Sequence, residues 1–97
     1  MPTYIGLANW TDQGIRNVKD SGKRYDTFKE VLRKHGGEAR ELFMTMGSYD
    51  LVVIYDAPSD EVAAEVNLRL ASTGNVRTTT MKAFGEQEYR RITAAIG

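Results

Sequence analysis

The chain has 97 residues, 13 of them basic and 13 acidic, and it contains no cysteine. This length corresponds to one domain, residues 1–97, and an apolar fraction of 41% is typical of a globular protein rather than a disordered one. The balanced charge leaves no basic face for nucleic acid, and the lack of cysteine excludes disulfides and thiolate metal sites.

The sequence shows no targeting signal, no membrane-spanning stretch and no cofactor-binding motif. Residues 1–6 lack a basic segment followed by an apolar core, and no apolar stretch approaches the roughly 20 residues that span a bilayer. A single histidine without cysteines offers little for zinc or haem. We therefore expect a soluble cytoplasmic protein with no membrane partner and no cofactor.

The first part of the chain predicts a strand followed by a helix. Residues 3–10 read as the strand, with Ile5 and Leu7 on one face and Tyr4, Gly6, Ala8 and Trp10 on the other. A short turn follows, with Asp12 as its candidate N-cap. Residues 23–35 place four apolar side chains at helical spacing, namely Tyr25, Phe28, Val31 and Leu32. Two glycines, Gly36 and Gly37, end this helix.

The second part predicts two strands, a helix, a fourth strand and a terminal helix. The strands are residues 40–46, 51–56 and 76–84. The helix opens after Pro58 with Ser59 or Asp60 as its cap, and it ends at Gly74. Its buried stripe comprises Val62, Ala63, Val66 and Leu70. Residues 86–96 have weaker apolar spacing and predict a short terminal helix.

This order of elements, β-α-β-β-α-β, predicts the ferredoxin-like split β-α-β fold of the α+β class. Its four-stranded antiparallel sheet has both helices on one face, which leaves the other face bare. We expect Tyr4, Gly6, Ala8 and Trp10 on the bare face, which is then too apolar for exposure to water. Only the terminal helix remains to cover it, so a second copy, packed sheet against sheet in a two-fold homodimer, is the economical solution.

The segment Gly47-Ser48-Tyr49-Asp50 lies between the second and third strands. Gly47 suits a turn position with positive φ. Asp50 can accept hydrogen bonds from backbone N–H groups of the turn or from a partner subunit, and Tyr49 offers an apolar face with a polar tip. Two interpretations stay open, one in which the motif locks a turn and one in which it contacts a ligand or an interface.

With this motif the chain resembles the GYD family, small proteins named for a Gly-x-Tyr-Asp segment and without an established activity. Further segments fit the resemblance across nearly the whole chain, at residues 11–14, 36–37, 56–58, 74–78 and 86–89. The resemblance implies a dimeric α+β barrel of two ferredoxin-like subunits. The chain is more distantly similar to the effector-binding domain of leucine-responsive transcription regulators, which bind amino acids at subunit interfaces. No helix-turn-helix precedes the first strand, so any such role is that of a stand-alone module.

The candidate ligand-binding residues are those expected to line a cavity between two sheets. Small Gly6 and Ala8 beside large aromatic side chains leave room, and threonines of the fourth strand add hydroxyl groups, although threonine also simply favours strands. Met81 and Ala83 are expected under the helices. The predicted site comprises Tyr4, Trp10, Tyr49, Asp50, Thr78 and Thr80. In the alternative interpretation, side chains of the partner fill this space.

No catalytic residue is predicted. The one histidine, His35, lies in the last turn of a helix, where a capping role explains it. The favoured function is a homodimeric small-ligand-binding or assembly module, with a pocket at the sheet–sheet interface for a small metabolite. The alternative is a cofactor-free enzyme of the monooxygenase or isomerase type. Its acid–base groups would be limited to Tyr4, Asn9, Asp50 and Tyr55.

Overall fold

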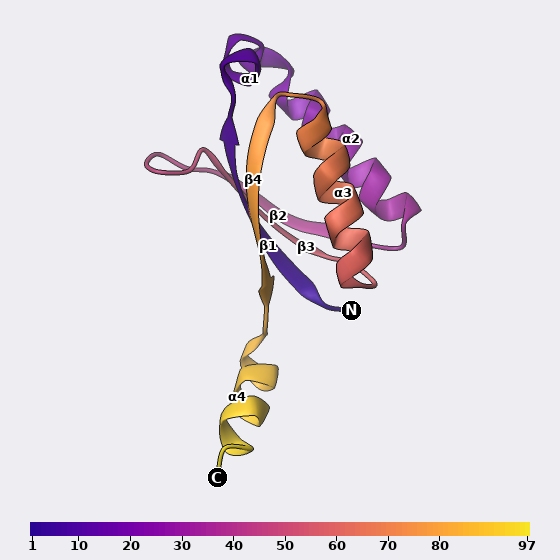
Figure 1. Cartoon of the computed structure of the whole chain (residues 1–97), viewed down its shortest axis with the longest axis vertical. Coiled ribbons are helices and arrows are strands. Elements are labelled where there is room, and N and C mark those ends of the chain that lie inside the picture. The colour runs from indigo at the N-terminus through magenta and orange to yellow at the C-terminus, as the bar shows by residue number, and fades with distance from the viewer.

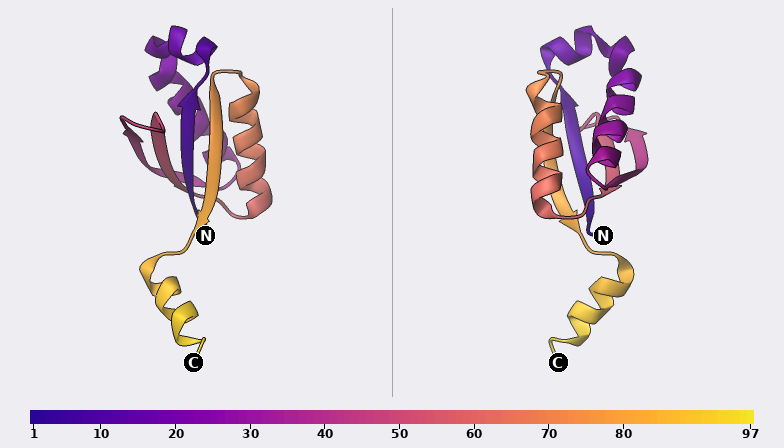
Figure 2. Two further views of the ribbon diagram at one scale, coloured as in Figure 1. Left: turned by 60° about the vertical axis from the view of Figure 1, so that its left-hand side comes forward. Right: turned by 90° about the vertical axis from the view of Figure 1, so that its right-hand side faces the viewer.

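The predicted order of elements is confirmed by a computed structural model that describes all 97 residues. The elements are β1 (Thr3–Trp10), α1 (Asp12–Arg16), a 3-10 turn (Val18–Asp20), α2 (Ser21–Lys34), β2 (Glu38–Met44), β3 (Leu51–Asp56), α3 (Asp60–Ser72), β4 (Val76–Ala83) and α4 (Glu86–Ala94). The strands form one antiparallel sheet in the order β2-β3-β1-β4 (Figure 1). Both α2 and α3 lie on the same face of it (Figure 2). None of the helices is long and apolar enough to cross a membrane.

Side-chain caps fix where two of the helices begin. The hydroxyl of Thr11 accepts a hydrogen bond from the Gly14 N–H at 3.1 Å, so Thr11 is the N-cap of α1 and the prediction of Asp12 was wrong. Ser59 is the N-cap of α3, because its hydroxyl accepts the Val62 N–H at 3.2 Å. The predicted element boundaries otherwise differ from the observed ones by a few residues at most.

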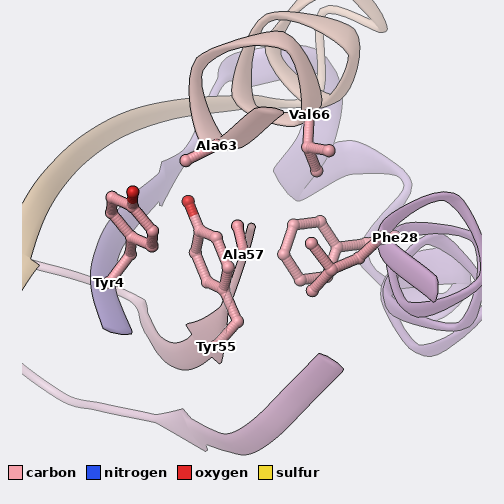
Figure 3. Close-up of a cluster of buried hydrophobic side chains, with 7 residues drawn as sticks. Tyr4, Phe28, Tyr55, Ala57, Ala63 and Val66 are labelled. Atoms are coloured by element: carbon pink, nitrogen blue, oxygen red, sulfur yellow. The ribbon is translucent and has the colours of Figure 1, made fainter. Parts of the chain in front are cut away.

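An aromatic row forms the centre of the core between the sheet and the helices (Figure 3). The Tyr4 and Tyr55 rings stack with centroids 5.5 Å apart, and Phe28 of α2 meets Tyr55 edge-on at the same separation. Leu32 and Val66 complete the packing from the two helices. The predicted apolar stripes of α2 and α3 are thus confirmed as the buried faces of these helices.

The two faces of β1 are the reverse of the prediction. Tyr4, Gly6 and Ala8 point toward the helices, and Tyr4 is only 3% exposed. Register then places Thr80 and Thr78 on this helix side as well, because they pair with Gly6 and Ala8. Met81, expected under the helices, lies on the opposite side and is 44% exposed. The physical reason is that the ring of Tyr4 fills the space beneath α3, whereas the other face offers it no such cover.

The uncovered face of the sheet is apolar, as expected, but its residues differ from the predicted ones. Strand alternation and register place six apolar side chains on this open face, namely Ile5, Leu7, Phe43, Val52, Ile54 and Met81. Phe43 is 52% exposed, and the four central side chains are partly exposed. The terminal helix α4 does not cover them, because it extends away from the rest of the chain and all its residues are exposed (Figure 1).

Candidate functional site

Asp50 ties the β2–β3 hairpin to the end of β1. Its backbone N–H donates to the Ala8 carbonyl at 2.9 Å, and its carboxylate accepts the backbone N–H of Trp10 at 3.0 Å. The Thr45 N–H donates to the Asp50 carbonyl at 2.8 Å and closes the loop. Gly47 has φ +140°, the positive value expected from the sequence. These contacts agree with the turn-locking interpretation, although the donor to the carboxylate lies on β1 rather than in the turn.

Two of the predicted aromatic residues, Tyr49 and Trp10, lie near the same end of the sheet as Asp50. Tyr49 belongs to the protruding loop between β2 and β3 (Figure 1), and its carbonyl accepts the Thr45 hydroxyl at 2.6 Å. The indole N–H of Trp10 is buried and has no hydrogen-bond partner. A buried unpaired donor costs free energy, so this indole is a group that would gain from an acceptor brought by a partner or ligand.

Tyr4 has a structural hydrogen bond under α3. Its hydroxyl donates to the carboxylate of Asp60 in the first turn of α3, and the ammonium group of Lys82 lies 3.2 Å from the same oxygen. Burial first, and then this hydrogen bond, raises the pKa of Tyr4 to about 12. The hydrogen bonds from Tyr4 and Lys82 lower the pKa of Asp60. Tyr4 is therefore a neutral donor near pH 7 and not a base.

The two predicted threonines also face α3. The Asn67 side-chain amide of α3 donates a hydrogen bond to the Thr80 hydroxyl. Thr78 lines a shallow hollow against the same helix with Asn67 and Leu68. The six predicted residues consequently do not form one cavity. Trp10, Tyr49 and Asp50 gather at the hairpin end of the sheet, whereas Tyr4, Thr78 and Thr80 are distributed beneath α3.

A more enclosed concavity lies between α2 and α3, and we call it the α2–α3 cleft. Its volume is about 300 Å³. It is lined by Arg24, Thr27, Phe28, Val31, Val66, Arg69, Leu70, Thr73 and Asn75. A smaller hollow of about 60 Å³ reaches toward the sheet and shares Arg24, Phe28, Leu70 and Asn75 with it. Arg24 is not among the candidate residues that the sequence predicted, although its spacing of four from Phe28 puts both on one helix face.

His35 joins the C-terminal end of α2 to the middle of α3. One ring nitrogen, Nδ1, lies 2.8 Å from the Val31 carbonyl, and Nε2 lies 2.6 Å from the carboxylate of Glu65 on α3. A hydrogen bond from Arg69 lowers the pKa of Glu65, with a smaller contribution from His35. His35 thus caps α2, as its position predicted, and also bridges to α3. The structure contains no cluster of three side chains suited to a metal ion.

The fold is shared with solved structures of low sequence identity. The leucine response regulatory protein LrpA of Mycobacterium tuberculosis superimposes with a TM-score of 0.66 at 15% identity, over 87% of this chain. The chain spans about half of that regulator, 51% of its length. The Thermus thermophilus protein TTHA0845 gives a TM-score of 0.55 at 24% identity, over 88% of this chain and 95% of that one. These structural similarities establish the fold. They also agree with the distant resemblance to leucine-responsive regulators.

Sequence comparison identifies the family. A curated protein of Thermus thermophilus, named glutamine synthetase and cystathionine beta-lyase binding protein, is 33% identical over 85 residues. That match covers 87% of this chain and 90% of the relative. The GYD domain model matches residues 4–93, which confirms the resemblance seen in the motif. The chain belongs to the GYD domain family.

Proposed function

We propose that this protein is a binding module that works as a homodimer, with the open face of the sheet as the surface between the two copies. The observation that supports this most is the row of cross-strand apolar pairs on that face. Ile5 pairs with Ile54, and Leu7 pairs with Val52. Nothing in the chain covers them, and a contiguous apolar patch of this kind marks an interface.

A two-fold axis through the open face buries the same residues of both copies, because the contact is isologous. Any small molecule enclosed between the sheets would then meet the aliphatic side chains of the open face and not the predicted tyrosine and threonine hydroxyls. This lining suits an apolar metabolite or interdigitating side chains of the partner. The surfaces left free for other proteins are the helix side and the extended α4.

The name of the Thermus relative supports a binding role toward enzymes. We extend this to the present chain as binding of glutamine synthetase or cystathionine β-lyase. The enzyme alternative gains no support, because two of its four acid–base groups lie on the helix side of the sheet and a third is already hydrogen-bonded. Tyr4 and Tyr55 are buried on the helix side, and the Asp50 carboxylate accepts the Trp10 N–H.

The dimer surface is tested by introducing a charge at its centre. Leu7→Glu places a carboxylate within the open face and should convert the dimer to a folded monomer, because an unpaired charge is costly to bury. Ile15→Glu is the matched control, since Ile15 is an exposed apolar residue of α1 away from that face. Light scattering reports the mass, and circular dichroism reports the fold. Equal masses for the two variants would contradict the proposed surface.

Enzyme binding is tested separately with the purified chain immobilised on a biosensor. Glutamine synthetase and cystathionine β-lyase from the same organism are passed over it, with an unrelated enzyme of similar charge as the control. Saturable binding of either enzyme supports the role. Equal responses from all three would reject it and leave the dimer proposal to be judged by the mass measurement.

A further inference from the structure

We propose that the α2–α3 cleft binds a small organic acid, with the carboxylate on Arg24 and the apolar body on Phe28 and Leu70. The cleft lies on the helix side of the sheet, opposite the open face. This site is therefore distinct from the dimer surface, and either proposal can fail without the other.

Arg24 brings a positive charge to the α2–α3 cleft. This side chain is partly buried and takes part in none of the ion pairs of the structure. Its guanidinium donates only to two backbone carbonyls, that of Asn17 at 3.1 Å and that of Gly14 at 3.4 Å. These bonds hold the group in place without neutralising it. A partly desolvated cation that forms no ion pair favours an anionic ligand.

Arg24 also keeps N–H donors that no group of the protein uses. A guanidinium has five N–H bonds in a planar fork, and the two carbonyls use two of them. Three stay available, and the fork geometry suits the two oxygens of a carboxylate. Arg69, at the other helix, is a weaker candidate for the same role, because its Nε already donates to Glu65 at 3.1 Å.

The α2–α3 cleft has an apolar surface on which the body of a ligand can pack. Phe28 and Val66, which face each other across the helix layer in Figure 3, provide an apolar floor with Val31 and Leu70. The other five lining residues are polar or charged, namely Arg24, Thr27, Arg69, Thr73 and Asn75. A pocket that combines apolar surface with polar groups is the usual form of a small-ligand site, and about 300 Å³ is at the small end of the range for such sites. The ligand class is thus a short branched or aromatic monocarboxylate.

The rim at the Arg24 end is held by the segment around α1. Gln13 donates to the Thr73 carbonyl at 3.2 Å and to the Asn75 side chain at 3.1 Å. The backbone of Gly14 approaches the Asn75 carbonyl so closely that an added Cβ would lie 1.9 Å from that oxygen. This packing fixes the Gly14 and Asn17 carbonyls, which accept from Arg24, relative to α3. The guanidinium is therefore held in position before a ligand binds.

The test uses nuclear magnetic resonance titrations with 4-methylpentanoate and phenylacetate as probes. The neutral amide of 4-methylpentanoate and acetate serve as controls for the charge and for the apolar body. The proposal predicts saturable shifts at Phe28 and Leu70 with either acid. The amide should bind about tenfold more weakly or worse, because it lacks the negative charge and one of the two acceptor oxygens of the carboxylate. Acetate should give no saturable shift in the cleft.

Variants locate the site on the full chain. Arg24→Gln should weaken acid binding about tenfold or more, whereas Arg33→Gln, on the outer side of α2 and paired with Glu30, should not. Thr27→Phe places a ring at the exposed rim of the cleft and should block binding without altering the core. This second variant decides the matter if Arg24→Gln does not fold. The proposal is overturned if neither acid shifts the cleft, if the amide binds as well as the acid, or if the folded cleft variants bind like wild type.

Discussion

The hydrogen bond between Asp50 and Trp10 should contribute measurably to stability. Asp50→Ala removes the acceptor 3.0 Å from the Trp10 N–H and leaves that donor without a partner in a partly buried place. Hydrogen bonds to charged groups contribute about 1.5–3 kcal/mol, and water can reach part of this site, so we expect a loss of about 1–3 kcal/mol. For a domain of this size each kcal/mol corresponds to roughly 4–8 °C in Tm.

The measurement is thermal unfolding followed by circular dichroism at one fixed protein concentration, because self-association itself raises Tm. Asp50→Asn keeps an acceptor oxygen and should lose less than Asp50→Ala. Gly47→Val should cost at least as much as Asp50→Ala, since φ +140° is strained for a β-branched residue even though its Cβ meets no atom within 4 Å. Ser48→Ala in the same exposed loop is the control. If Asp50→Ala and Gly47→Val both melt like wild type, the motif does not lock the hairpin.

Two further predictions concern the helix side of the sheet. Gly14→Ala should destabilise the protein by about 2 kcal/mol or more, because the added Cβ would overlap the Asn75 carbonyl. In Gly22→Ala, within α2, the added Cβ meets nothing within 4 Å, so this variant should be more stable by about 0.5–1 kcal/mol. Urea unfolding compares the free energies of unfolding of the two variants. Tyr4 has a folded-state pKa raised to about 12 from 10.0, so the unfolded chain releases this proton first and stability should fall as pH rises from 10 toward 12. The Tm of Tyr4→Phe should fall less steeply with pH over that range than the Tm of the wild type. If both fall with the same slope, Tyr4 does not cause this pH dependence.

The element order was predictable because local signals agree along the chain. Apolar residues recur at helical spacing in α2 and α3, β-branched residues concentrate in the strands, and glycines mark the ends of the helices. The Gly47–Asp50 turn was also predictable from residue type, because a positive φ selects glycine. Each of these features is decided within a few residues of sequence.

The orientation of β1 was not predictable in this way. Both of its alternating sets are apolar, so periodicity separates Ile5 and Leu7 from Tyr4 and Ala8 but does not decide which set faces the helices. The deciding contact joins Tyr4 to Asp60, 56 positions away in the sequence. The placement of Thr78 and Thr80 was wrong for the same reason, since their faces follow from register with β1.

The α2–α3 cleft was missed because it depends on how two separate helices pack over the sheet. Its one local signal was a cation, Arg24, on the same helix face as Phe28. Such a residue can extend its charged end to water along an apolar surface, so spacing alone does not separate that role from ligand binding. The carbonyl partners of Arg24, on Gly14 and Asn17, are visible only in the folded chain.

The joining of two copies through the open face is tested most directly by the mass of the protein in solution. Light scattering at micromolar concentration should report at least twice the chain mass of 10.9 kDa, with Leu7→Glu reduced to one chain and Ile15→Glu unchanged. A wild-type mass equal to one chain over the whole concentration range would contradict the account.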